Sequence, residues 1–135
     1  MSELIEPLAV KRTERGWAGH FICADRCLFR RNTLLELGCT RIVVSSVGLM
    51  KNFPPFDKEE KFTTVGYDRH FETMAFMAQW DGRYWDADVS RQVGFDSPWA
   101  ISEPDADDRA NDMHEAVVNE LVHKLMTGNV TCIDA

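Results

Sequence analysis

Apolar and polar side chains alternate along residues 73–90, a pattern that predicts a β-hairpin. Its centre is Asp81-Gly82, a dipeptide typical of two-residue type I′ turns because both turn positions need a positive φ. Such a turn pairs Trp80 with Arg83 and thereby fixes the register of both strands. The face that this register makes apolar consists of Met74, Phe76, Ala78, Trp80, Trp85, Ala87 and Val89.

Short apolar runs on both sides of the hairpin predict further strands. Residues 41–47 are β-branched and apolar on both faces near their start, as in a central strand. Residues 27–37 alternate poorly: we favour a strand to Phe29 with a turn at Asn32, and the alternative is a short helix that ends at Gly38. The other expected segments are an edge strand at 8–11, a buried strand at 20–24, a surface loop at 51–61, and strands at 62–66 and 99–102.

Apolar side chains recur at three- and four-residue steps between residues 105 and 126, which predicts one amphipathic helix. Pro104 suits its first turn, and the aspartates that follow favour the positive end of the helix dipole. Gly128 suits its C-terminal end. Residues 127–135 are then expected to form a flexible tail.

These elements predict one α+β domain over residues 1–135, with a mostly antiparallel sheet of about six strands, the hairpin at 73–90 and one C-terminal helix at 105–126. With 44% hydrophobic residues, a chain of this length can bury an ordinary core without disulfides or metal. One helix covers only one face of such a sheet, so we expect a homo-oligomer.

Three features of the chain bear on its cellular location. No apolar run approaches the roughly 18 residues of a membrane span, so we expect no membrane contact. The N-terminus has no basic region before an apolar stretch, unlike a signal peptide. The four cysteines lie in a domain that needs no disulfides. Together these features predict a cytoplasmic protein with reduced thiols.

The charge distribution favours a small ligand over a polymer. The net charge is −7, which argues against DNA or RNA as a partner. Arginines nevertheless cluster at residues 26–31, and arginine binds phosphate through two parallel hydrogen bonds, while asparagine can read a base edge. Aromatic residues in loops can stack on a base. The residues that we assign to a nucleotide-sized anion site are Arg30, Arg31, Asn32, Arg69, Phe95 and Trp99.

Other polar groups match catalytic or metal-binding patterns only partly. The spacing H-x2-C-x3-C of His20, Cys23 and Cys27 leaves the fourth zinc ligand undefined. Asp86 and Asp88 share one strand face and could serve acid/base chemistry or hold a metal, but a solvated strand face has the same pattern. We therefore expect no catalytic residues, no metal and no cofactor.

Histidines on the predicted helix do not form the H-E-x-x-H zinc motif. His114-Glu115 is followed by His123, which lies nine residues after His114 instead of four. The expected role of these residues is a solvated helix face. A Ser-His-Asp order and a glycine-rich phosphate loop are also missing from the sequence, so no machinery for turnover is visible.

Residues 19–35, 42–48, 69–76 and 111–115 together resemble phage and prophage proteins of the sponge-type Thoeris anti-defence family. The resemblance implies a non-catalytic oligomer, a hexamer, that sequesters cyclic ADP-ribose isomers made by TIR-domain enzymes. Some members also bind cyclic oligonucleotides.

The resemblance also bears on the site. Family sites place arginines on phosphates and an aromatic side chain on adenine, which implies phosphate roles for Arg30 and Arg31, with Asn32 and Arg69 beside them. No position of this chain matches the family's aromatic residue, and residues 53–56 match no family pattern, so the ligand stays open. The resulting hypothesis is an immune-evasion protein of the host cytoplasm that sequesters a cyclic nucleotide. The alternatives are a small metal-dependent nucleotide phosphodiesterase and a protein-binding anti-defence inhibitor.

Overall fold

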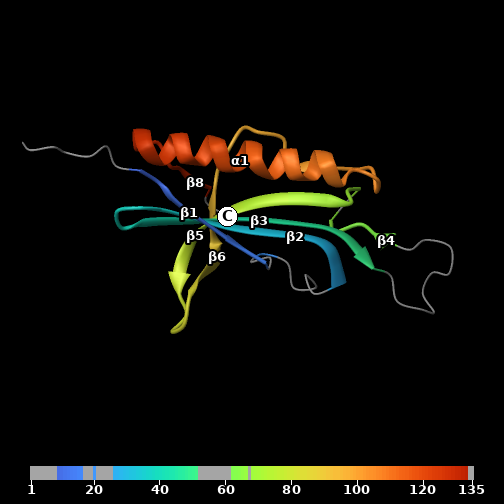
Figure 1. Cartoon of the computed structure of the whole chain (residues 1–135), viewed down its shortest axis with the longest axis horizontal. Coiled ribbons are helices and arrows are strands. Elements are labelled where there is room, and N and C mark those ends of the chain that lie inside the picture. Colours follow the sequence, from blue (N-terminus) through green and yellow to red (C-terminus); the bar gives the residue numbers. More distant parts are fainter. Residues whose placement is uncertain (1–8, 17–19, 21–25, 52–61, 67, 134–135) are drawn as a thin grey trace, which may run out of the picture.

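The computed structural model describes residues 9–16, 20, 26–51, 62–66 and 68–133. Within these residues, one antiparallel sheet is built in the order β1-β2-β3-β5-β6-β8, with β4 paired to β3 and β7 paired to β5. The helix α1 lies along one face of the sheet, and the β5–β6 hairpin bends away from it (Figure 1). The elements are β1 (Lys11–Arg15), β2 (Cys27–Leu37), β3 (Thr40–Lys51), β4 (Phe62–Thr63), β5 (Phe71–Trp80), β6 (Trp85–Val93), β7 (Ala100–Ile101), α1 (Asp107–Thr127) and β8 (Cys132–Ile133).

The predicted α+β class is confirmed, and most strands lie where apolar runs predicted them. The strand expected at 41–47 extends to β3, and the short strands expected at 62–66 and 99–102 appear as β4 and β7. The edge strand lies a few residues later than expected, as β1. Apart from His20 and Lys51, the expected strand at 20–24 and loop at 51–61 lie outside the described residues. No helix in the described part of the chain is long and apolar enough to cross a membrane.

The predicted turn at Asn32 is wrong, and so is the alternative helix. β2 continues through Asn32 to Leu37, and the chain turns at Gly38, whose φ is +59°. β2 lies between β1 and β3, and side chains 32–35 are all buried. The strand therefore lacks the alternation of a half-exposed strand, which is why its pattern was ambiguous.

The β5–β6 hairpin has a four-residue loop instead of the predicted two-residue turn. Trp80 pairs with Trp85, and the Asp81 carboxylate accepts hydrogen bonds from the backbone N–H groups of Arg83 and Tyr84. Next to the turn the register thus differs from the prediction by two residues, and the predicted face is kept there because the side-chain period of a strand is two. An irregularity between Ala78 and Phe76 then shifts the pairing further, so that Phe76 pairs with Gln92, and Val89 of the predicted apolar face is exposed.

The C-terminal region also differs from the prediction at both of its ends. The helix begins at Asp107, so Pro104 precedes it, and it ends with Gly128 in the left-handed conformation, as expected. The expected flexible tail includes β8, which pairs with β6, and the Gly94 N–H donates to the Thr131 carbonyl oxygen at 2.8 Å. The outer edge of β6 accepts this strand, a partner that the local sequence does not show.

Apolar residues are buried on both faces of the sheet. On the helix face, the main core joins the sheet to α1 and consists of Leu35, Ile42, Val44, Ala75, Val93, Val117, Val118, Leu121 and Leu125. On the far face, a smaller cluster contains the apolar side of the hairpin and consists of Leu34, Val43, Phe76 and Ala87, packed with Met74, Ala78 and Trp85. The hairpin therefore turns its predicted apolar face away from the helix.

Candidate functional site

A pocket of about 300 Å³ opens at the edge of β5. β6 pairs with β5 as far as Phe76, and β7 takes up the pairing at Glu72, so part of this edge lies between two strands. The loop 94–99 connects β6 to β7 and contributes two aromatic side chains to the pocket. The lining residues are Met74, Gln92, Val93, Phe95, Trp99 and Ile133.

Glu120 of the helix holds the loop that carries both aromatic residues. Its carboxylate accepts hydrogen bonds from Asp96 N at 2.7 Å, Ser97 N at 2.8 Å and Ser97 Oγ at 2.6 Å. Lys124 lies 3.3 Å from the same carboxylate and donates to the Gly94 carbonyl oxygen. Burial by itself raises the pKa of Glu120, but these bonds outweigh it and lower the pKa to about 2.

The Glu120→Gln variant is expected to loosen this loop. The amide accepts through one oxygen and carries no charge, so the three donors lose charge-assisted bonds worth about 1–2 kcal/mol of unfolding free energy in total. Hydrogen exchange at the amides of Asp96 and Ser97 should accelerate. The matched control is Glu103→Gln, which removes an exposed ion pair with Arg109 and should leave stability and hydrogen exchange nearly unchanged. Equal effects of the two variants would contradict the role of Glu120.

The second aromatic wall, Trp99, is supported by a chain of polar contacts. The Arg69 guanidinium lies 4.6 Å from the Trp99 ring centroid, and its Nε donates to Glu72 at 2.6 Å. His20 Nε2 lies 3.0 Å from the other oxygen of Glu72, whose side chain is only 9% exposed. Burial raises the pKa of Glu72, but the bonds from His20 and Arg69 outweigh it, so the pKa is lowered. Arg69 thus stacks on the indole of Trp99, which lines the pocket.

Only half of the residues assigned to the site from the sequence lie at this pocket. Phe95 and Trp99 line it, and Arg69 packs on Trp99. Arg30, Arg31 and Asn32 lie on β2, which β3 separates from β5. Arg30 and Arg31 point to opposite faces, as expected for neighbours in a strand.

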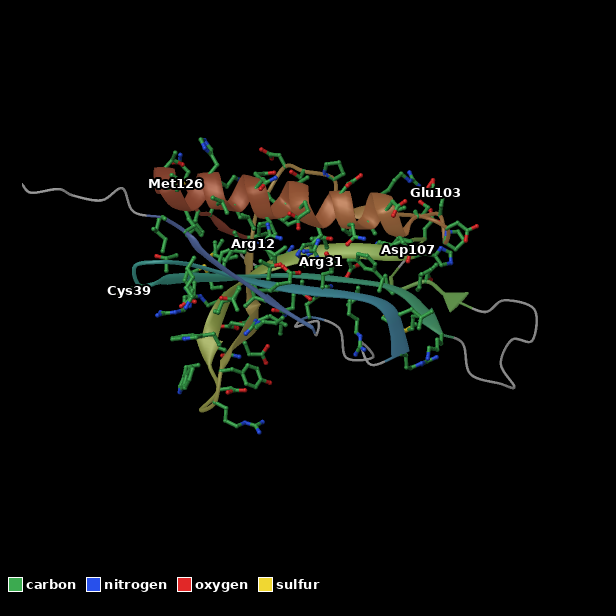
Figure 2. The ribbon with its side chains drawn as sticks, viewed as in Figure 1. Arg12, Arg31, Cys39, Glu103, Asp107 and Met126 are labelled. Atoms are coloured by element: carbon green, nitrogen blue, oxygen red, sulfur yellow. The ribbon has the colours of Figure 1, made fainter. Side chains whose placement is uncertain are left out.

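Arg31 points to the helix face, where carboxylates already surround it. It contacts Glu14 at 2.7 Å and Glu115 at 2.9 Å. Arg12 contacts the same Glu115 at 2.5 Å, and Figure 2 shows Arg12 and Arg31 between the helix and the sheet. The hydrogen bond from Arg12 is the largest cause that lowers the pKa of Glu115, to about 2, and the contact with Arg31 adds to it. Arg31 therefore joins β1, β2 and α1.

Arg30 and Asn32 lie on the far face. Arg30 is exposed and has no ion pair among the described residues. Asn32 is fully buried, and its Oδ1 accepts from Arg15 Nε at 2.7 Å. Arg15 also donates to the Trp85 carbonyl oxygen, so it joins β1 to the hairpin across the far face. Burial lowers the pKa of Arg15.

His114 is fully buried, so its expected place on a solvated helix face is wrong. Nε2 lies 2.7 Å from Thr33 Oγ1, and Nδ1 lies 2.6 Å from Ser46 Oγ, which contacts Thr73 Oγ1 at 2.5 Å. Burial is the largest cause that lowers the pKa of His114, to about 4, and the Arg31 charge adds to it. The imidazole is therefore neutral at pH 7.

The partners of His114 determine which of its nitrogens carries the proton. Thr33 donates its only hydroxyl hydrogen to the Glu14 carboxylate, which can only accept. Thr33 Oγ1 is thus an acceptor for His114 Nε2–H, and Nδ1 must accept from the Ser46 hydroxyl. The chain of donors runs from Thr73 through Ser46, His114 and Thr33 to Glu14.

The other polar groups considered from the sequence lie apart from the pocket. Asp86 accepts from the N–H of Ala87, and Asp88 accepts from the N–H and hydroxyl of Ser90. In the part of the chain that the structure describes, no three His, Cys, Asp or Glu side chains are grouped to hold a metal ion. Cys23 lies outside this part, and Cys27 is buried.

Sequence reasoning missed five residues of this site: Met74, Gln92, Val93 and Ile133 of the lining, and Glu120 of the helix. Met74 belongs to the apolar face of the hairpin, but strand alternation does not show that it borders a pocket. Gln92 follows the predicted hairpin, and Ile133 falls in the segment assigned to the tail. Glu120 is one acidic residue among many on the helix, and its role depends on a loop more than 20 residues earlier.

Comparison of the chain with protein-family models, with curated proteins and with solved structures finds no match.

Proposed function

We propose that this protein binds a nucleotide-derived small molecule and sequesters it without turning it over. The observation that carries the proposal is the pocket that Phe95 and Trp99 line, with Arg69 stacked on Trp99. Small-molecule sites are mostly apolar hollows with few polar anchors. Stacking of one base on an aromatic side chain contributes about 1–3 kcal/mol.

The size of the pocket limits which part of a ligand enters it. At about 300 Å³ it lies at the lower end of small-molecule sites, so it suits one ring system rather than a whole cyclic nucleotide. The phosphates would then lie outside. Of the three arginines assigned from the sequence, Arg30 is the one exposed on the far face and left to contact them, either directly or from a neighbouring subunit of a homo-oligomer. Arg31 is committed to Glu14 and Glu115.

The resemblance to sponge-type anti-defence proteins suggests which ligand to test. Under this proposal the protein works in the host cytoplasm and removes a cyclic ADP-ribose isomer, or a related cyclic nucleotide, from a defence effector. The test incubates purified protein with the products of a TIR-domain enzyme acting on NAD⁺, removes unbound material, denatures the protein by heat and analyses the released compounds by mass spectrometry. Recovery of an intact nucleotide supports sequestration. A degraded product in the unbound or the released fraction would favour the phosphodiesterase alternative. Recovery of all the nucleotide intact in the unbound fraction would contradict both.

The Trp99→Ala variant is expected to bind this ligand about 10- to 100-fold more weakly by calorimetry. It removes a stacking surface worth about 1–3 kcal/mol, and 1.4 kcal/mol corresponds to a factor of ten. The matched control is Trp80→Ala, because Trp80 is 56% exposed and Trp99 is 43% exposed. Trp80 lies six residues from Met74 along β5, about 20 Å from the pocket. A loss of affinity that is equal in both variants would contradict the site.

A further inference from the structure

Gln92 lines the pocket and has a fixed backbone position. Its backbone pairs with Phe76 of β5 on one side and with Ile133 of β8 on the other. Its neighbour Val93 is fully buried in the core under the helix. Because successive side chains of a strand point to opposite faces, Gln92 projects to the far face, where Met74 lies.

The carboxamide of Gln92 has little to bind within the protein. Its Nε2 lies 4.0 Å from Met74 Sδ, a weak acceptor and its only hydrogen-bond partner among the described residues. The other lining side chains are apolar or aromatic. A carboxamide surrounded by such groups favours a ligand that offers a complementary donor and acceptor.

We propose that Gln92 determines specificity by reading the edge of a ring that carries an amino group next to a ring nitrogen. The carboxamide oxygen accepts from the amino group, and its NH₂ donates to the ring nitrogen, as in the bidentate pairing of glutamine with adenine. This inference rests on the proposed function, since it concerns the same pocket. It adds that the aromatic walls bind any flat ring, whereas Gln92 selects an aminopurine.

Two nucleosides of nearly the same shape test this proposal. Adenosine carries the amino group, and purine riboside lacks it. Calorimetry should show that the wild-type protein prefers adenosine about 10- to 100-fold, the range expected for one bidentate pair. The Gln92→Met variant keeps the length of the side chain but removes both polar groups. Its affinities for the two nucleosides should lie within about threefold of each other, mainly because it binds adenosine more weakly.

The matched control is Gln79→Met, which makes the same change at an exposed position of β5 and should keep the wild-type preference. Circular dichroism and Tm establish that both variants fold. The proposal is overturned if Gln92→Met keeps the preference, if Gln79→Met also loses it, or if the wild-type protein binds the two nucleosides equally or not at all.

The experiment separates this proposal from the function on which it rests. A Gln92-dependent preference for adenosine, together with no retained product of the TIR-domain enzyme, would support the specificity of the pocket and contradict the proposed ligand. Retention of an intact nucleotide by the wild-type protein and by Gln92→Met alike, without discrimination between the nucleosides, would support sequestration and overturn the role of Gln92.

Discussion

Acidification from pH 6.5 to pH 4.5 is expected to lower the free energy of unfolding by about 2 kcal/mol through His114 alone. In the unfolded chain this histidine takes up a proton near pH 6.5, whereas burial holds its pKa at about 4 in the folded protein. The unfolded state therefore binds more protons in this window, and stability falls as the pH falls. Protonation also removes the acceptor at Nδ1, so Ser46 can no longer donate to it.

His114 and the carboxylates near it affect the free energy of unfolding in different pH ranges. Arg31 opposes its protonation, and Glu14 and Glu115 favour it. The pKa of Glu115 is about 2, so the stability that this carboxylate contributes is present above about pH 4.5 and is lost only below it. Measurements between pH 6.5 and 4.5 therefore report mainly on His114.

Denaturant unfolding of the wild-type protein and of His114→Gln at several pH values checks this prediction. The variant should be less stable at pH 7.5 but should lose much less stability on acidification. His123→Gln, which changes an exposed histidine of the same helix, should keep the wild-type slope. If His114→Gln does not fold, an NMR titration of the wild-type imidazole gives the answer, since His114 should stay neutral above pH 5. Equal slopes for wild type and His114→Gln, or protonation near pH 6.5, would refute the expectation.

The Gly48→Ala variant is expected to lose about 3 kcal/mol of stability, a fall of roughly 10 °C in Tm. A Cβ at this position would overlap the Phe71 side chain and lie 2.9 Å from the His70 carbonyl oxygen. Phe71 is fully buried and packs edge-on against Phe29, with the ring centroids 5.4 Å apart. Neither the ring nor the backbone oxygen can move away without opening the contact between β3 and β5.

Gly16→Ala is the control for this prediction, because a Cβ there meets no atom within 4 Å. It should leave Tm unchanged or raise it slightly, since alanine restricts the unfolded chain more than glycine does. Thermal unfolding followed by circular dichroism measures both variants. A fall of less than about 2 °C for Gly48→Ala would show that the strands separate more easily than the packing indicates.

The sequence predicted the fold class because the periods of strand and helix are local properties. The hairpin shows what local periods cannot predict. Alternation determines which side chains share a face, but the loop length depends on the hydrogen bonds from the backbone of Arg83 and Tyr84 to Asp81. A register shift of two residues leaves the pattern unchanged, so no pattern could reveal it. The ambiguity at Asn32 has a similar cause, since β2 is covered by neighbours that lie far away in the sequence.

The site was predictable only in part, for a related reason. Phe95 and Trp99 were assigned because aromatic residues in loops can stack on a base, and the structure places both at one pocket. The role of Arg31 could not be read from its local cluster, because its partners Glu14 and Glu115 come from β1 and α1. Which charge meets which carboxylate is decided by tertiary packing, and the sequence around Arg31 shows only that a cation is present.

The order in which the pocket's parts leave the ribosome follows from its lining. Each lining residue lies at or after Met74, and one wall, Ile133, belongs to β8. The sheet can form most of β1 to β6 during synthesis, but Glu120 reaches its loop only after α1 has docked. The pocket is therefore complete only after Ile133 has been synthesised, and under the proposed function a shorter nascent chain cannot hold the ligand.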